Sequence, residues 1–253
     1  MLHTPPLFTA SLSPSQEDNL KYLVSLCVKK DNLTLSCPLD AGLFWLAFLG
    51  EQLVSCLAAY ELEENVWECC GFTHPDFRNQ GFFSKLLNEA CKDGSALEEA
   101  DLYFAVDGHC PEALKVLSHL EAEHVYDEFM MERTLNPVKE AAFPHFSDFS
   151  LSIDNAVSEG NPGQAHGFFQ GLPAGSCFLD PQKNRVYLYG LEIFKPLRGQ
   201  GLGRRFMQLL IPALENMGFR SLLLQVSSEN TAALSLYKKT GFCITQTLSY
   251  FLY

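Results

Sequence analysis

The sequence lacks several features that would assign it to particular classes of protein. No basic segment followed by a long apolar run opens the chain, so we expect no targeting segment. The most apolar window, residues 41–60, is interrupted at Gly50, Glu51 and Gln52, and it predicts a strand hairpin rather than a membrane span. These features predict a cytoplasmic protein that makes no contact with a membrane.

Cysteine pairing and metal-ligand spacing are also missing. The nine cysteines form no C-x-x-C pair and are odd in number, which is typical of reduced, buried thiols in the cytoplasm. His119 and His124 are five residues apart and would lie on different faces of a helix. We therefore expect neither a disulfide framework nor a metal site.

Positive charge is scarce. The chain of 253 residues has a formal net charge of −12, which makes sequence-independent binding to a nucleic acid unfavourable. The same acidity gives slight support to a cationic small-molecule partner. A hydrophobic content of 47% and a charged content of 19% are those of a soluble globular protein.

The chain does contain an internal repeat with an offset of 120 residues. RGQGLG at 198–203 has a counterpart, RNQGFF, at 78–83. At the same offset, without a gap, the matching residues are Val66 and Val186, Trp67 and Tyr187, Val106 and Val226, Ala113 and Ala233, and Leu114 and Leu234. A constant offset over about fifty residues indicates a duplicated unit.

Each copy has a regular order of predicted elements. In the second copy, a strand over 186–193 is followed by the glycine loop, a helix, an apolar strand over 221–226, a helix capped by Asn230, and a closing strand. A helical crossover between two strands predicts that they are parallel. We expect an α/β (α+β) fold of two fused units, each a mixed, mostly antiparallel sheet with one splayed parallel pair and flanking helices.

The two copies differ in their opening segments. Residues 14–30 predict a helix ahead of the first copy, whereas residues 137–176 contain no convincing amphipathic helix. We infer that the opening helices of the second copy are lost or shortened. The predicted division is an N-terminal domain at 1–136, a linker at 137–148 and a C-terminal domain at 149–253.

The second glycine loop has the properties of an anion-binding loop. Glycines between a strand and a helix bring backbone N–H groups to an anion, and the helix dipole adds to the attraction. A P-loop would need G-K-[ST], but Arg204 follows Gly203. A dinucleotide fingerprint would need its third glycine one residue later.

R-x-x-G-x-G, opening a helix after a strand, resembles the acyl-CoA loop of the GNAT acetyltransferase family. The downstream pattern N-x-x-A-x-x-x-Y-x-x-x-G-F is also similar to that family, with Asn230, Ala233, Tyr237, Gly241 and Phe242 at its positions. The resemblance covers 186–242, and the whole chain fits two GNAT-like units. It implies that acetyl-CoA or a related acyl-CoA binds the second copy as co-substrate, without a metal.

The resemblance also implies individual roles. Acyl-CoA would be bound by Leu191, Ile193, Arg198, Gly199, Gln200, Gly201, Leu202, Gly203, Arg204, Asn230, Ala233 and Tyr237. The Tyr237 hydroxyl group would protonate the leaving thiolate, although a tyrosine on an apolar helix face is often only a core residue. Some relatives carry a glutamate where this chain has Gln225, which cannot act as a base. Glu192 is the nearest alternative carboxylate and could equally be a solvated residue.

The first copy differs from the second at the positions that matter for binding. Phe83 replaces Gly203, Cys110 replaces Asn230, and Leu117 replaces Tyr237. We expect a degenerate site that does not bind acyl-CoA in the same way. Its proposed uses are to complete the fold of the second copy and to form a wall of the acceptor pocket.

The sequence therefore predicts a tandem N-acetyltransferase that is active in its C-terminal half. Its acceptor would be a primary amine of a small molecule or peptide, attacking the thioester directly. Two alternatives stay open: a protein N-terminus or lysine as acceptor, and a non-catalytic acyl-CoA-binding or interaction module.

Overall fold

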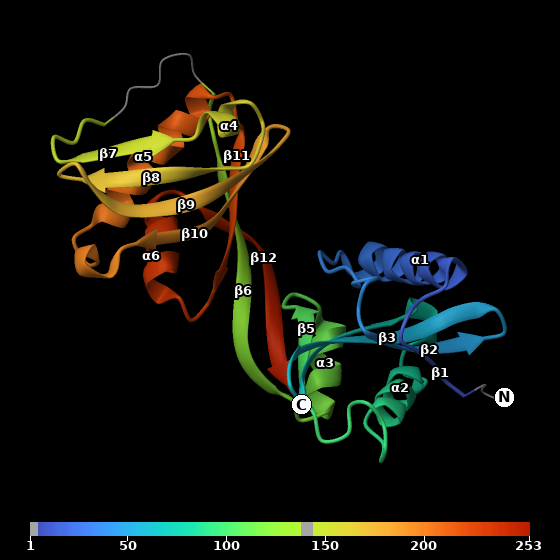
Figure 1. Cartoon of the computed structure of the whole chain (residues 1–253). Coiled ribbons are helices and arrows are strands. Elements are labelled where there is room, and N and C mark those ends of the chain that lie inside the picture. Colours follow the sequence, from blue (N-terminus) through green and yellow to red (C-terminus); the bar gives the residue numbers. More distant parts are fainter. Residues whose placement is uncertain (1–4, 138–143) are drawn as a thin grey trace. The chain divides into compact units, whose positions relative to one another are not determined.

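The computed structural model describes residues 5–137 and 144–253, which pack as two units. Unit 1 consists of residues 1–127 together with the C-terminal residues 247–253, and unit 2 consists of residues 128–246. Figure 1 shows the elements of each unit. The family resemblance predicted two units of mixed sheet and helix, and this prediction is confirmed.

Unit 1 is built on a sheet with the strand order β1-β2-β3-β4-β5-β12. Its pairs are antiparallel except for β4 and β5, which run parallel. The strands are β1 (Leu7–Thr9), β2 (Leu43–Leu49), β3 (Gln52–Glu63), β4 (Val66–Thr73), β5 (Asp101–Asp107) and β12 (Cys243–Leu252), and the helices are α1 (Pro14–Asp31), α2 (Phe82–Ala90) and α3 (Pro111–His119).

Helices cover both faces of the unit 1 sheet (Figure 1). The apolar side of α1 packs Leu20, Leu23 and Cys27 against one face. Leu86 and Leu87 of α2 pack against the other face. Helix α1 begins where the sequence predicts, because the Ser13 side chain accepts a hydrogen bond from the Gln16 amide and the Gln16 side chain bonds back.

Unit 2 repeats this plan with strand order β6-β11-β10-β9-β8-β7, in which only β10 and β11 are parallel. The strands are β6 (Glu123–Thr134), β7 (Phe149–Ile153), β8 (Gly163–Phe169), β9 (Leu172–Gln182), β10 (Arg185–Ile193) and β11 (Ser221–Ser227), and the helices are α4 (Asn155–Ser158), α5 (Leu202–Asn216) and α6 (Thr231–Lys239). Helix α5 continues through Pro212 and ends before Gly218, whose φ is +92°.

The sheet of unit 2 has its hydrophobic core on one face. Phe206, Leu210 and Leu214 of α5 are fully buried there. The opening helix of this copy is reduced to the four residues of α4, as the sequence predicted, and Val157 of α4 packs into the same core. In the described part of unit 2, therefore, the face of the sheet opposite α5 has no helix that corresponds to α1 in unit 1.

The two units exchange their last strands. The C-terminal strand β12 pairs with β5 of unit 1, with Leu248 opposite Asp107 and Leu252 opposite Tyr103. Strand β6, which ends the first copy in sequence, pairs with β11 of unit 2, with Glu128 opposite Ser227. Each unit is thus completed by a strand from the other copy.

The division predicted from sequence differs from the packing units at both of these strands. The prediction placed 128–136 in the first domain and 247–253 in the second, whereas 128–136 pack in unit 2 and 247–253 pack in unit 1. Residues 138–143 of the predicted linker lie outside the described residues. Strand periodicity cannot reveal this exchange, because the exchanged strands have the same element type and the same place in the repeat.

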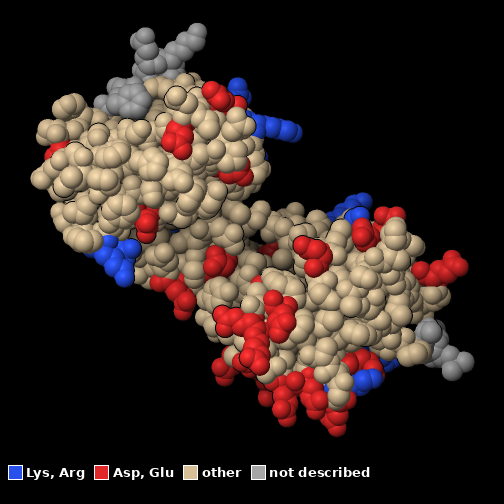
Figure 2. Space-filling view, in the orientation of Figure 1, with Lys and Arg blue, Asp and Glu red and all other residues tan. Residues whose placement is uncertain are grey.

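Charge is divided unequally between the units. Unit 1 contains seven Lys and Arg against twenty Asp and Glu, a net charge of −13, whereas unit 2 contains eleven against ten, a net charge of +1. Figure 2 shows acidic side chains gathered over the surface of unit 1. The acidity of the whole chain is therefore a property of unit 1 alone.

No helix among the described residues is long and apolar enough to cross a membrane. No group of His, Cys, Asp and Glu in the described ranges is arranged to hold a metal ion.

Candidate active site

The RGQGLG loop connects the end of β10 to the start of α5 through a short turn at Lys195–Leu197. Gly199 and Gly201 have φ values of +77° and +75°, which residues with a Cβ rarely adopt. No side chain caps α5. Within the described residues, the backbone N–H groups of 199–203 donate no hydrogen bond, so several amides are available to a ligand.

Glycine is suited to position 203 for a different structural reason from that at positions 199 and 201. It lies inside the first turn of α5 without a positive φ, and a Cβ there would lie 3.4 Å from a methyl group of Leu236 and 3.8 Å from Ile193. A single methyl group would fit at ordinary contact distance. A larger side chain would have to project into the space between α5, α6 and β10.

The three arginines of the loop are not equivalent. The Nε atom of Arg198 donates to the carbonyl oxygen of Ile193 at 2.7 Å, which fixes the turn to the strand end. Arg205 pairs with Asp148 at 2.7 Å and lies over the ring of Phe146, so its charge is already partnered. Among the described residues, no carboxylate pairs with Arg198 or Arg204, and both are exposed. These two cations are available to an anion.

Strands β10 and β11 separate early. Their parallel pairing covers three residues of each strand and ends at Tyr187 opposite Leu223. Beyond this point β10 contains a bulge at Gly190 and Leu191, with Gly190 at φ +63°. A glycine in the left-handed region at the first bulge position is a common form of bulge. The splayed pair predicted for this copy is therefore present.

Gly175 of β9 makes the bulge possible. A Cβ at this position would collide with the carbonyl oxygen of Glu192 and approach Ile193. The equivalent residue of unit 1 is Ser55, whose hydroxyl group lies 3.2 Å from the carbonyl oxygen of Phe72. A regular strand accommodates that serine, but the bulged strand of unit 2 requires glycine.

Helix α6 starts at the residue that the sequence predicts. The Oδ1 atom of Asn230 accepts a hydrogen bond from the Ala233 amide at 3.2 Å, so Asn230 caps the helix. Ala233 is half-buried against the core of unit 2. The first turn of α6 is thereby held beside the region where β10 and β11 separate.

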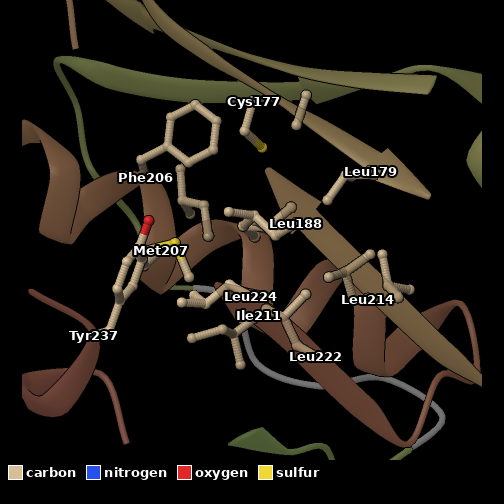
Figure 3. Packing of buried hydrophobic residues seen from close by; sticks show 14 of the residues in the cluster. Cys177, Leu179, Leu188, Phe206, Met207, Ile211, Leu214, Leu222, Leu224 and Tyr237 are labelled. Carbon is tan, nitrogen blue, oxygen red and sulfur yellow. The ribbon is translucent and has the colours of Figure 1, made fainter. Parts of the chain in front are cut away.

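Tyr237 of α6 is buried in the core of unit 2, with 6% of its surface exposed (Figure 3). Its ring lies 5.5 Å from that of Phe242, and its hydroxyl group points in the direction of Met207. Burial, with a smaller contribution from Cys177, raises the pKa of Tyr237 to about 12. At neutral pH the phenol is therefore protonated. This state suits a tyrosine that only fills the core, and it equally suits an acid that donates a proton.

Carboxylates lie on the face of the sheet opposite α5. Glu192 is exposed on β10 just after the bulge, and Gln225 is exposed on β11. Glu128 of β6 was not identified from sequence, because β6 was assigned to the first copy. It is half-buried, and Gln225 lies on the same face of the sheet. Burial raises the pKa of the Glu128 carboxyl, and the nearby polar side chain of Gln225 opposes that shift.

The other residues predicted to bind the cofactor differ in how far their side chains are buried. Leu202 is fully buried, Leu191 and Ile193 are half-buried in the core, and Gln200 is exposed. Only the main-chain groups of Leu202 could reach a ligand.

The corresponding loop of unit 1 has the same backbone conformation, but the side chains around it differ. Asn79 and Gly81 have φ values of +58° and +78°, like the second loop. The ring of Phe83 lies over Gly71, where a Cβ would be 2.5 Å from it, and meets Phe104 edge-on. Phe83 therefore fills space between α2 and the two parallel strands.

Arg78 of unit 1 is also partnered. Both of its terminal nitrogens bond Asp31, at 3.1 and 2.5 Å, while its Nε donates to Thr73 as that of Arg198 does to Ile193. A cavity of about 590 Å³ remains in this unit, lined by residues that include Cys27, Leu33, Phe83 and Cys110. Its arginine is neutralised, so this cavity has no free arginine for a phosphate.

Comparison with known proteins was made at three levels. The family model described as "Acetyltransferase (GNAT) family" matches the chain twice, over residues 13–116 and 123–242. "N-alpha-acetyltransferase 30" of Schizosaccharomyces pombe is 36% identical over 59 residues, which cover 23% of this chain and 39% of that protein. A "Mycothiol acetyltransferase" of Jonesia denitrificans is 36% identical over 63 residues, covering 25% of this chain and 20% of that protein. The matches thus span well under two thirds of either relative.

Solved structures share the fold over nearly the whole chain. A GCN5-related N-acetyltransferase from Sphaerobacter thermophilus has a TM-score of 0.70 at 15% identity, covering 97% of this chain and 95% of that one. A tandem GNAT protein from the clavulanic acid biosynthesis pathway has a TM-score of 0.67 at 12% identity, covering 98% of each chain. At these identities the likeness is one of fold.

Proposed function

The chain belongs to the acetyltransferase (GNAT) family, and on this premise we propose that unit 2 is an acyl-CoA-dependent N-acetyltransferase acting on a primary amine. The observation that carries the proposal is the RGQGLG loop, where free backbone amides lie beside Arg198 and Arg204. A helix start with unpaired N–H groups and two unpaired cations is suited to a pyrophosphate.

The neighbouring strands support the rest of the cofactor site. Acetyl-CoA would extend from the loop amides into the space between β10 and β11, where the bulge at Gly190 and Leu191 interrupts the regular pairing of β10. Asn230 and Ala233 would hold the start of α6 beside it. The net charge of +1 on unit 2, against −13 on unit 1, favours binding of this anionic co-substrate by unit 2.

The chemistry needs few groups. A neutral amine attacks the thioester carbonyl, and backbone N–H groups of the bulge would stabilise the oxyanion. Tyr237, protonated at neutral pH, would give a proton to the departing thiolate. Glu192 is the carboxylate proposed from sequence to assist deprotonation of the amine.

The proposed acceptor class follows from the names of curated relatives. We propose an amine of a small molecule or peptide, in line with a relative named as a mycothiol acetyltransferase. A protein N-terminus is the second candidate, favoured by the match to an N-alpha-acetyltransferase. We also propose a cytoplasmic location, supported by nine cysteines that are all unpaired.

The test is thermal unfolding with and without acetyl-CoA, together with release of CoA thiol in the presence of a panel of amines. Binding to the native state alone stabilises by about 2.7 kcal/mol at a hundredfold excess over Kd. Gly203→Phe should abolish this stabilisation, because its ring would project between α5 and α6. Gly203→Ala is the matched control and should bind normally, since its methyl group fits at 3.4 Å.

Each outcome has a clear meaning. Unit 1 carries Phe83 at the equivalent position, so the fold itself accepts phenylalanine there. No stabilisation of wild type by acetyl-CoA would exclude the proposed co-substrate. Stabilisation without thiol release for any amine would leave a non-catalytic acyl-CoA-binding module as the function.

A further inference from the structure

Glu128 lies at the site of unit 2 although it belongs to the first copy in sequence. It pairs opposite Ser227 at the end of β11, while Met130 pairs opposite Gln225. Directly paired residues point to the same face of a sheet, and so do residues two apart on one strand. Glu128 and Gln225 therefore share one face, at neighbouring positions of two paired strands.

This face is the one on which an acceptor can approach. Leu222, Leu224 and Val226 of β11 point into the core beneath α5, so Gln225 points to the opposite side. On that side Phe178 and Tyr189 stack at 5.1 Å and are 41% and 52% exposed. In the described part of unit 2, no helix covers these side chains.

The position along the strands is equally specific. Pairing of β10 with β11 ends at Leu223, so Gln225 lies two residues into the separated region. Glu192 pairs opposite Ser176 of β9 and shares the face of Phe178 and Tyr189. One carboxylate is thus on β10, and the other is on the strand that flanks β11.

Unit 1 differs at this position. The residue of β12 that pairs with Asp107, as Glu128 pairs with Ser227, is Leu248. A carboxylate at this place is found only in the unit whose loop keeps its free arginines. The strand exchange is what brings it there.

We propose that Glu128, delivered by the exchanged strand β6, accepts the proton that the acceptor ammonium must lose before it attacks. This rests on the proposed acetyltransferase function of unit 2. Gln225, which cannot act as a base itself, positions the carboxylate through its amide. This replaces the role in deprotonation that the sequence suggested for Glu192, which then serves to attract the cationic acceptor.

The step balances as follows. The ammonium group gives one proton to the Glu128 carboxylate, and the freed lone pair forms the C–N bond at the thioester carbon. The C–S bond breaks, a second nitrogen proton is lost to solvent, and the thiolate receives a proton from Tyr237, which is then reprotonated. The products are the amide, CoA thiol and one proton that Glu128 passes to water.

The experiment compares two kinds of nucleophile on the full chain. One kind is a set of alkyl amines, namely a polyamine, an aminoglycoside and a short peptide with a free N-terminus, all largely protonated at neutral pH. The other is hydroxylamine, which is largely neutral at the same pH and needs no base before attack. CoA thiol release is measured for wild type, Glu128→Gln and Glu192→Gln, with Glu132→Gln as a control on the same strand and face.

We expect Glu128→Gln to lower kcat for the alkyl amines by about 100-fold or more, with KM for acetyl-CoA unchanged and hydroxylamine turnover within about threefold of wild type. Glu192→Gln should mainly raise KM for the cationic amines, and Glu132→Gln should match wild type. If Glu128→Gln lowered kcat equally for both kinds of nucleophile, the assignment would be overturned. It would also be overturned if Glu192→Gln, and not Glu128→Gln, lowered kcat for the alkyl amines alone. No transfer by wild type to either nucleophile would overturn the proposed function and this assignment with it, whereas transfer that ignores Glu128 overturns only the assignment.

Discussion

Unit 1 and unit 2 contain the same loop backbone in different surroundings. Both loops have two residues with positive φ, and both precede a helix without a side-chain cap. In unit 1 the arginine is bound to Asp31 and Phe83 fills the space above Gly71. In unit 2 the equivalent arginine, Arg198, pairs with no carboxylate among the described residues. The loop conformation therefore follows from the fold, whereas the proposed binding of an anion would depend on a few neighbouring side chains.

The parallel strands differ in register as well. Trp67 pairs with Leu102 in unit 1, whereas Val186 pairs with Leu222 in unit 2. Leu102 and Leu222 are equivalent at the offset of 120, so Trp67 is the structural equivalent of Val186, not of Tyr187. The extra residue in β10 is Gly190, the bulge residue that β4 lacks. A gapless alignment of the two copies is thus wrong by one residue in this strand.

The largest expected effect comes from separating the copies at the linker. A chain of residues 141–253 lacks β6, which leaves β11 with an open edge and removes Met131, fully buried in the core of unit 2. We expect it to lack a cooperative thermal transition by circular dichroism. A chain of residues 121–246 retains β6 and should unfold cooperatively. Equal behaviour of the two chains would show that the exchange is not required for folding of unit 2.

A smaller effect is expected from Gly175→Ala. The added methyl group collides with the Glu192 carbonyl and should push the bulge of β10 toward the regular strand found in unit 1, at a cost of about 1–3 kcal/mol of unfolding free energy. We expect acyl transfer to fall at least tenfold, because one misplaced backbone group is sufficient for that. Gly42→Ala in unit 1 is the control, since its nearest neighbour to a Cβ is 4.0 Å away. Unchanged kcat in Gly175→Ala would show that the bulge is not used in catalysis.

The smallest expected effect is the alkaline stability change of Tyr237→Phe. The pKa of Tyr237 is about 12 in the folded chain and about 10 when unfolded, so its stabilising contribution is complete below pH 10 and is lost as pH rises toward 12. The unfolding free energy of wild type should therefore fall more steeply between pH 9 and 11 than that of Tyr237→Phe. Urea unfolding at both pH values measures this. Parallel curves would show that the hydroxyl group is not desolvated by folding, and would leave its proposed role as a buried acid without support.

Much of the architecture could be predicted because it depends on local sequence. The hairpin of β2 and β3, the glycine loops and the Asn230 cap depend on neighbours within a few residues, and all are confirmed. The bulge also had a local signal, the lone Gly190 in a strand pattern. The strand exchange had none, because β6 and β12 fit either unit by periodicity. For this reason the boundary predicted from sequence places Glu128 in the first domain, whereas it packs in unit 2.

The exchange also imposes an order on synthesis. A ribosome makes the chain from its N-terminal side, yet β5 of unit 1 pairs with Leu248–Leu252, which follow unit 2 in the sequence. Until then the nascent N-terminal half has an unpaired sheet edge, which is a surface that other chains can join. Unit 1, whose first strands are made before any of unit 2, is therefore completed only after all of unit 2 has been synthesised.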